Sequence, residues 1–445
     1  MKEKKVSAPR AGVMLDIGRK YFAPGQIRRL IGELSSRGMD FLQLHFSEDA
    51  GFGIEVPGFE WLPGRDGELC TQGPVGSLAT DGRFLSCEEL REISACAAAA
   101  GVEIIPSFDS PGHLNFAVAR FHDRARDGGV SFSHDGVRYE VLCRDEQYHF
   151  FADGKELTDI PEPSRVYGIG SYFSTDGRVS RVCGTNNHSF SRGIDLANPV
   201  AVAFAEELLD RCAGFFRTLG CRAVDIGGDE LLGFVPAAVD TSVKPRWGQL
   251  DTWAERAREI TGKETAVAYD MFVLYMNRLY RRMRALGYDS VRAWNDEFMR
   301  ESDTGWKYAD AGHVQFEKGF AVQFWSAKPA FVTPCDVADR GHRITGADSV
   351  FCYYVLTEKA RSTPPQAYVK SNPESIEKEW DVWSFGAPEA PGRTLDTPSR
   401  RGMLDGWMTC VWCDRPDLRT DAEVIDELLP LLDAFAKKVR QQGIA

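Results

Sequence analysis

The stretch Cys221–Glu230 reads CRAVDIGGDE, a short apolar strand followed by two glycines and two adjacent carboxylates. The β-branched residues of this stretch favour a buried strand. Side chains of neighbouring residues on a straight strand point to opposite faces, but the two glycines allow a sharp bend. Asp229 and Glu230 can then face one place, where like charges raise the pKa of one carboxyl group. Such a group is a candidate proton donor, although an acidic pair taken alone also fits a solvated turn.

Strand-like segments alternate with helix-like segments along most of the chain. The expected strands are residues 12–18, 40–47, 102–109, 221–226, 290–295, 320–325, 349–356 and 407–412. The spacing of apolar residues predicts helices over 24–38, 87–100, 199–219, 264–287 and 422–441, with a polar loop before residue 264. Eight strands that alternate with helices imply parallel pairing and an α/β fold, the (β/α)8 TIM barrel. We expect residues 1–445 to form a single barrel domain.

Residues from about 114 to 194 interrupt this alternation. Segments such as GVRYEVLC and YHFFADGKEL are punctuated by Gly and Asp and predict small antiparallel hairpins. We interpret the segment as a β-rich insertion in the connection after the third strand, because unusually long connections are often functional. Two roles stay open for it: it rims the pocket and restricts leaving groups, or it forms the contact of a homodimer.

The formal net charge of −12 disfavours nucleic acid and anionic membrane surfaces as partners. No run of 18 apolar residues is present, so no membrane span is expected. The N-terminus lacks the apolar core of a signal peptide and predicts a cytoplasmic protein, although a secreted protein whose signal has been trimmed would look the same.

The chain has 11 cysteines, an odd number that favours free thiols in a reducing compartment. Only Cys410 and Cys413 have the CxxC spacing, and no second pair or histidine cluster accompanies them in the sequence. A zinc site is therefore not expected. No glycine-rich loop precedes a helix in the pattern that binds a phosphate cofactor, so we expect neither a metal nor a cofactor.

Polar and aromatic side chains follow nearly every expected strand. In strand order they are Arg19, His45, Asp109 with His113, Asp229 with Glu230, Trp294 with Asn295 and Asp296, Trp325, Tyr353 with Tyr354, and Trp412 with Asp414. The carboxyl ends of barrel strands meet on one face, where activity is located. Flat aromatic surfaces beside directional hydrogen-bonding groups suit a sugar ring, which has an apolar face and a rim of hydroxyls.

The acid pair narrows the chemistry expected on such a sugar. Ordinary glycosidases place two carboxylates on opposite sides of the scissile bond. Asp229 and Glu230 are adjacent in sequence, which disfavours that arrangement and favours different roles for the two carboxyl groups. Substrate-assisted hydrolysis requires two such roles. The 2-acetamido group of the sugar is the nucleophile, while the protein supplies an acid and orients the acetamide.

Several motifs together resemble a known family. They are GVMLDIGRKYF (12–22), FLQLHFSEDAGFGIE (41–55), EIIPSFDSPGH (103–113), DIGGDE (225–230), AWND (293–296) and the tyrosine pair of the seventh strand. They resemble the family 20 glycoside hydrolases, the β-N-acetylhexosaminidases. The resemblance implies removal of terminal β-linked N-acetylhexosamine (GlcNAc or GalNAc) from oligosaccharides or glycans, with retention and through an oxazolinium intermediate. The chain also resembles members without the usual N-terminal α+β domain, because its first strand begins within 20 residues.

The resemblance also implies residue roles. Glu230 matches the general acid/base, Asp229 the carboxylate that orients the acetamide, and Tyr354 the tyrosine that hydrogen-bonds the acetamide carbonyl. The implied substrate-binding set comprises Arg19 and Asp414 for sugar hydroxyls, Trp294, Trp325 and Trp412 as an aromatic box, and Asp109 and His113 as a network supporting the acid.

One residue departs from the family pattern: Asp225 stands where the family commonly has histidine. A third acid there either raises the pKa of Glu230 further or is paired with an arginine. The departure keeps a non-catalytic carbohydrate-binding barrel as an alternative. A second alternative is a diguanylate cyclase, because GGDEL resembles the GGDEF motif. That motif belongs to a β-hairpin with metal-binding acids upstream, and it leaves the aromatic strand ends unexplained.

Overall fold

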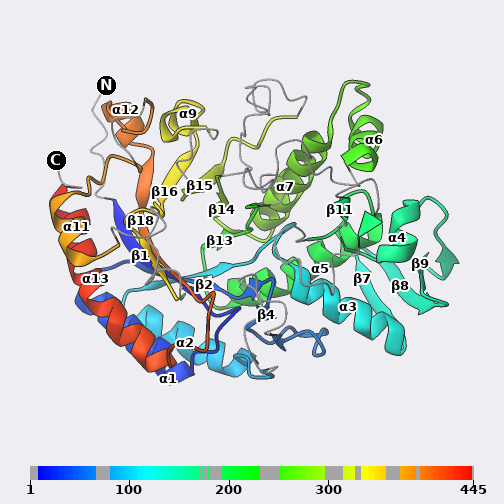
Figure 1. Ribbon diagram of the computed structural model, residues 1–445, viewed down its shortest axis with the longest axis horizontal. Helices are drawn as coiled ribbons and strands as arrows, with labels where there is room; N and C mark the ends of the chain where they lie inside the picture. Colours follow the sequence, from blue (N-terminus) through cyan, green and yellow to red (C-terminus); the bar gives the residue numbers. More distant parts are fainter. Residues whose placement is uncertain are drawn as a thin grey trace.

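Eight parallel strands form a closed barrel surrounded by helices in the computed structural model (Figure 1). The structure describes residues 9–66, 81–170, 173–174, 179–180, 193–230, 250–295, 314–325, 332–356, 371–386 and 391–442. The barrel strands are β1 (Arg10–Asp16), β2 (Phe41–His45), β6 (Glu103–Ser107), β13 (Ala223–Asp225), β14 (Ser290–Trp294), β15 (Phe320–Phe324), β16 (Arg343–Gly346) and β18 (Leu404–Trp412). They pair in this order, and β1 closes the barrel against β18. The predicted (β/α)8 fold is therefore confirmed.

Helices cover the outside of the barrel. The longer ones are α1 (Pro24–Ser36), α2 (Cys87–Ala99), α5 (Pro199–Thr218), α6 (Leu250–Thr261), α7 (Ala268–Ala285) and α13 (Asp421–Gln442), and the short ones α9 (Pro334–Asp339), α11 (Pro373–Lys378) and α12 (Pro398–Arg401). Five confirm predicted helices, whereas α6 replaces part of a predicted loop. Local signals explain several starts: a Ser86–Glu89 capping box begins α2, and Asn198 caps α5 ahead of Pro199. No helix among these residues is long and apolar enough to cross a membrane.

Alternation along each strand divides the apolar residues into two cores. Outward residues such as Leu42 and Val224 pack beneath the helices. Inward residues form a second cluster inside the barrel, which contains Met14, Phe41, Ile105, Ala223, Trp294, Ala347, Tyr353, Met408 and Cys410. Successive side chains of a strand face opposite sides, so an inward position can be read from the strand register. Trp294 and Tyr353 of this inner cluster lie at the carboxyl end of the barrel, where the candidate site is built, whereas Phe41 begins β2 at the amino end.

The seventh strand differs from the predicted segment 349–356. Strand β16 fills the barrel position between β15 and β18. Six residues, 347–352, separate it from β17 (Tyr353–Val355). Strand β17 pairs with the far part of β18, with Tyr353 opposite Cys410 and Val355 opposite Trp412. The prediction missed β16 because RITG is short and has little apolar character beside SVFCYYVL.

The predicted insertion forms a small antiparallel sheet beside the barrel, with cyan strands that lie at one end of the molecule in Figure 1. After α3 (Asn115–Asp127) come β7 (Val130–His134), β8 (Val137–Arg144), β9 (Gln147–Ala152), β10 (Lys155–Glu156) and α4 (Glu162–Tyr167), then the pair β11 (Phe173–Ser174) and β12 (Val179–Ser180). The hairpin prediction is confirmed. The sheet contacts α3 and α5, and His134 pairs with Glu206 on α5. Both proposed roles of the insertion remain predictions.

Candidate active site

The acid pair lies on a strained turn after β13. Gly227 and Gly228 have φ of 73° and 95°, and Glu230 itself has φ of 47°. A Cβ on Gly227 would lie 2.7 Å from the backbone nitrogen of Ser110, so only glycine fits against the neighbouring loop. This close approach brings the turn beside the loop after β6, which carries His113. The positive φ of Glu230 is the kind of backbone strain that occurs at functional sites.

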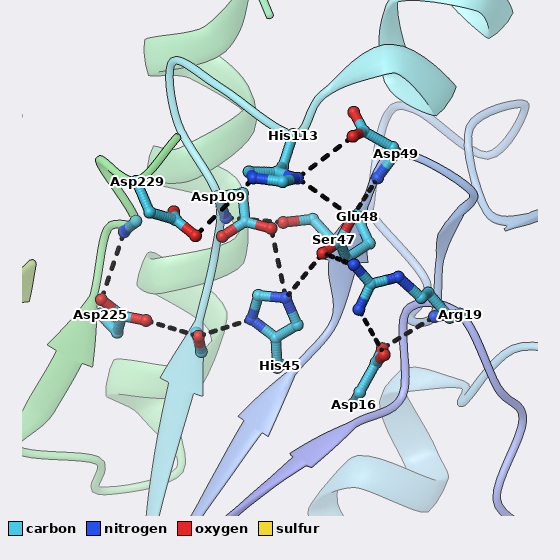
Figure 2. Close-up of polar contacts among 12 residues, drawn as sticks. Asp16, Arg19, His45, Ser47, Glu48, Asp49, Asp109, His113, Asp225 and Asp229 are labelled. Carbon is cyan, nitrogen blue, oxygen red and sulfur yellow. Dashed lines mark hydrogen bonds and ion pairs between the residues drawn. The ribbon is translucent and has the colours of Figure 1, made fainter. Parts of the chain in front are cut away.

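The imidazole of His113 faces both members of the acid pair, and its approach to Asp229 can be seen in Figure 2. Its Nε2 lies 3.4 Å from Glu230 Oε2 and 3.7 Å from Asp229 Oδ2. Its Nδ1 lies 3.1 Å from Asp49 Oδ2 and 3.4 Å from Glu48 Oε2. Burial would lower the pKa of His113, but the surrounding carboxylates raise it well above the usual histidine value. The residue is therefore an imidazolium that holds four carboxylates together.

A second buried histidine lies beneath the first. His45 Nε2 is 3.2 Å from Asp109 Oδ2, and its Nδ1 is 3.0 Å from Ser107 Oγ. Asp109 is 1% exposed, so it supports the site and does not contact a sugar. Burial would lower the pKa of His45, but Asp109 and neighbouring acids raise it well above the usual value.

Asp225, the departure from the family pattern, lies still deeper. Ser107 Oγ donates to Asp225 Oδ2 at 2.6 Å, Gln43 Nε2 donates to the same oxygen at 3.2 Å, and the Gly227 N–H donates to Oδ1 at 3.2 Å. Burial raises the pKa of Asp225 to about 6. Among the described residues, no arginine lies within ion-pair distance of Asp225, so the expected arginine pair is not found there.

Arg19 anchors the opposite side of the site, directly after β1. Its guanidinium pairs with Asp16 at 2.9 Å, with Glu48, and with Asp414 at 3.8 Å. Burial would lower the pKa of Arg19, but these acids raise it well above its usual value. The carbon of the guanidinium lies 5.4 Å from the centroid of the Trp412 ring. Arg19 and Asp414 thus present a donor and an acceptor beside an aromatic face.

Four aromatic rings line the carboxyl end of the barrel interior. Trp412 lies 6.1 Å from Trp294 and 6.0 Å from Tyr353, measured between ring centroids. Tyr353 stacks on Trp325 at 6.2 Å with an interplanar angle of 13°. The backbone N–H of Trp325 donates to the Asn295 side chain at 2.8 Å, which fixes the end of β15 against β14. The predicted tryptophan box is therefore present as a contiguous set.

The structure contradicts the assignment of Tyr354 to the site. Tyr354 points away from the barrel interior, and its hydroxyl donates to Glu427 Oε2 on α13 at 2.7 Å. Tyr353 is the inward residue, because it pairs opposite Cys410 and belongs to the inner cluster. The register of a three-residue strand decides between two adjacent tyrosines, and the sequence carried no signal for that register.

Three groups of side chains among the described residues have the composition of a metal site. His134 with Asp135 and Glu206 lies beside the insertion, and the other two lie at the candidate site: His45 with Glu48 and Asp109, and Glu48 with Asp49 and His113. In the two groups at the candidate site the neighbouring carboxylates raise the pKa of the imidazole, and Glu48 is paired with Arg19, which favours ion pairing over metal ligation. Cys410 and Cys413 are buried free thiols whose pKa is raised by burial, which does not favour metal binding.

The predicted residues otherwise lie in one connected group. Contacts run from Asp229 and Glu230 through His113 and Glu48 to Arg19, and on to Trp412 with its ring neighbours. Asp16, Glu48 and Asp49 were not expected in the site, whereas Tyr353 and His45 were expected at strand ends without an assigned role. The polar run Ser47–Asp49 directly after β2 was the available signal for Glu48 and Asp49. Asp296 lies outside the described residues. A cavity of about 470 Å³ lies at the opposite, amino end of the barrel and includes none of these residues.

Several of the curated relatives are beta-hexosaminidases. The Vibrio vulnificus beta-hexosaminidase is 25% identical over 464 residues, covering 96% of this chain and 47% of that protein. The Vibrio furnissii beta-hexosaminidase is 34% identical over 181 residues, covering 37% of this chain and 29% of that protein. The chain thus spans less than half the length of these relatives.

Solved structures share the fold. Dispersin B superposes with a TM-score of 0.59 at 19% identity and covers 97% of this chain and 99% of its own. The exo-β-N-acetylglucosaminidase of Vibrio harveyi, solved with N-acetylglucosamine, gives a TM-score of 0.60 at 18% identity over 97% of this chain and 54% of its own. The model of the glycosyl hydrolase family 20 catalytic domain matches residues 10–439, and the chain belongs to that family.

Proposed function

We propose that this protein is a retaining β-N-acetylhexosaminidase that removes terminal GlcNAc or GalNAc by substrate-assisted hydrolysis. One observation supports this proposal most: adjacent Asp229 and Glu230 both face the His113 imidazolium from a turn at the carboxyl end of the barrel. Two carboxylates this close serve one side of a sugar and do not flank its glycosidic bond. Family membership and the hexosaminidase relatives agree with this assignment.

Glu230 is the general acid in this mechanism. It gives its proton to the glycosidic oxygen as that bond to the anomeric carbon breaks, while the acetamide oxygen of the substrate bonds to the same carbon. The result is a cyclic oxazolinium ion and a free leaving-group alcohol. Glu230, now a carboxylate, takes a proton from water as the water oxygen bonds to the anomeric carbon from the face the leaving group left. The bond between that carbon and the acetamide oxygen breaks in the same step, which restores the 2-acetamido group. Two inversions give net retention.

The remaining groups orient the sugar and balance charge. Asp229 accepts the acetamide N–H and its carboxylate offsets the positive oxazolinium. Tyr353, with Trp294, Trp325 and Trp412, encloses the acetamide methyl group and the sugar ring face. Arg19 and Asp414 hold the hydroxyls of the terminal residue. Low exposure of these groups keeps their electrostatic interactions strong during the reaction.

Hydrolysis of 4-nitrophenyl β-GlcNAc and β-GalNAc tests the assignment, together with inhibition by GlcNAc-thiazoline. The thiazoline mimics the cyclic intermediate, so we expect it to bind at least about 100-fold more tightly than the substrate. Turnover without thiazoline inhibition would indicate an enzyme nucleophile. Saturable sugar binding without turnover from pH 4 to 8 would instead support the non-catalytic barrel.

A further inference from the structure

Asp225 occupies the centre of the barrel directly beneath the turn that carries the acid pair. It is fully buried, and its two oxygens accept bonds from three elements: the Gly227 N–H of the turn, Ser107 of β6 and Gln43 of β2. Gly227 in turn packs on the backbone of Asp109 and Ser110. One carboxylate therefore ties the acid-bearing turn to two neighbouring barrel strands.

Asp225 also determines which protons His45 carries. The hydroxyl of Ser107 has a single proton, and it is donated to Asp225 at 2.6 Å. The contact of 3.0 Å between Ser107 Oγ and His45 Nδ1 then requires a proton on Nδ1. Because Nε2 of the same ring faces the Asp109 carboxylate at 3.2 Å, a proton is favoured there as well. The chain Asp225–Ser107–His45 therefore selects the imidazolium.

The charges around this chain are strongly unbalanced. Asp225 is approached by Ser107 and Asp109 of β6 and its loop, by Gln43 and His45 of β2, and by Gln323 of β15, with Arg292 of β14 acting at longer range. His45 is faced by Asp16, Glu48, Asp109 and the edge of Trp412. The His45 imidazolium is thus the cation that lies against Asp109 below the site, while Arg19 and His113 offset Glu48.

We propose that Asp225 is a positioning residue for hydrolysis, which fixes the acid-bearing turn and, through Ser107, keeps His45 doubly protonated against Asp109. An amide at position 225 would offer an N–H to Ser107, whose own proton would then turn toward His45 Nδ1. That exchange favours neutral His45 and removes the cation closest to Asp109, whereas Glu48 keeps Arg19 and His113. The turn of Asp229 and Glu230, which packs on Asp109, would lose its electrostatic support. The effect on catalysis rests on the function proposed above.

Kinetics of Asp225→Asn test this role. We expect kcat to fall about 10- to 100-fold, the loss typical of a group that orients a functional residue, with KM changed less than about threefold. Glu206→Gln is the matched control, because it also removes a buried carboxylate but lies on the outer helix α5. Wild-type kcat in Asp225→Asn at every pH would overturn the proposal.

Ser107→Ala keeps the carboxylate of Asp225 and cuts its link to His45, so it serves if Asp225→Asn does not fold. If the two residues act as one chain, the double variant loses about as much kcat as the worse single variant. If the loss of kcat in the double variant equals the product of the two single losses, Asp225 and Ser107 act independently, and the proposed chain is rejected.

The NMR titration of His45 separates this proposal from the proposed activity, because it needs no turnover. In either single variant the midpoint of the His45 titration should move at least one pH unit lower than in the wild type, while His113 moves less. An unchanged His45 midpoint would refute the chain even in an active hexosaminidase. A lowered midpoint in a protein that hydrolyses neither substrate would refute only the activity.

Discussion

Tyr353 stacks on Trp325 inside the barrel, whereas its neighbour Tyr354 leaves the barrel and binds Glu427 on α13. The alternation of a strand therefore gives two adjacent tyrosines entirely different surroundings. Of the two, Tyr353 is the one whose ring lies beside Trp325 and Trp412, so the proposed mechanism assigns the hydrogen bond to the acetamide to Tyr353.

Replacement of each tyrosine by phenylalanine distinguishes these surroundings. We expect Tyr353→Phe to lower kcat/KM about 100-fold, the cost of losing a donor to a developing charge. Tyr354→Phe should leave kcat/KM within about twofold and lower the free energy of unfolding by about 1 kcal/mol, because it loses one hydrogen bond. Steady-state kinetics and urea denaturation measure the two effects. The opposite pattern of activity would restore Tyr354 to the site.

Glu230→Gln tests the proton donor. The variant should lose about 1,000-fold in kcat/KM on substrates with alkyl leaving groups, which need protonation. On a dinitrophenyl glycoside, whose leaving group departs without a proton, the first chemical step should lose much less. Asp229→Asn provides the comparison, since a residue that stabilises the oxazolinium should matter for both substrates. Equal losses for both substrates in Glu230→Gln would contradict its role as the acid.

The raised pKa of Asp414 predicts that substrate binding depends on pH. Burial, with Asp16, Glu48 and Glu230 adding to it, raises the pKa of Asp414 to about 6 despite the opposing charge of Arg19. Below that pH the carboxyl group is protonated in the free enzyme and becomes a poorer acceptor for sugar hydroxyls. KM should therefore rise as the pH falls from 7 to 5, and kcat/KM should fall correspondingly. Asp414→Asn should have a high KM that varies little over this range. Asp225 also has a pKa of about 6. If KM of Asp414→Asn varied with pH as it does in the wild type, the pH dependence would belong to another group such as Asp225.

The buried carboxylate of Glu206 is expected to hold the insertion to the barrel more strongly than that of Glu207. It is fully buried and binds His134 at 2.8 Å and Arg278 at 2.7 Å, whereas the side chain of Glu207 is 16% exposed. Glu206→Gln should lower the free energy of unfolding by about 3 kcal/mol, because the buried imidazole of His134 loses its closer carboxylate partner. Glu207→Gln should cost about 1 kcal/mol or less. Equal losses of unfolding free energy in the two variants would mean that burial does not determine how much each glutamate stabilises the protein.

The same cluster carries a pH signature. Burial would lower the pKa of His134, but its bonds to Glu206 and Glu207 raise it above the usual value. The stabilisation is therefore complete below the unfolded pKa of about 6.5 and is lost as the pH rises through the higher folded value. The gap between wild type and Glu206→Gln should narrow between pH 6 and pH 9, as urea denaturation at several pH values would show.

The barrel and the position of its site were predictable because both depend on repeating, local signals. Alternation of strands and helices determines parallel pairing, and parallel strands place their carboxyl-end residues on one face. That rule alone was enough to predict the positions of Arg19, His113 and the three tryptophans. Glu230 needed in addition the two glycines that bend its backbone.

What could not be predicted depends on contacts between distant segments. The choice between Tyr353 and Tyr354 follows from the register of β17 on β18, and β17 is too short to show periodicity. The environment of Asp225 is built from three strands that are far apart in the sequence. Asp225 was therefore visible as an unusual acid, but its bond to Ser107 and the link to His45 were not.

The division of the seventh strand separates closure of the barrel from the placement of Tyr353. Strand β16 closes the barrel against residues 404–407 of β18, whereas β17 pairs with residues 410–412 of the same strand. The linker 347–352 is bonded to strands on both sides, because the N–H groups of Ala347 and Ser349 donate to carbonyls at the end of β15 and the carbonyl of Cys352 accepts from β18. A change in the length of this linker would therefore move the Tyr353 ring relative to Trp325 and Trp412.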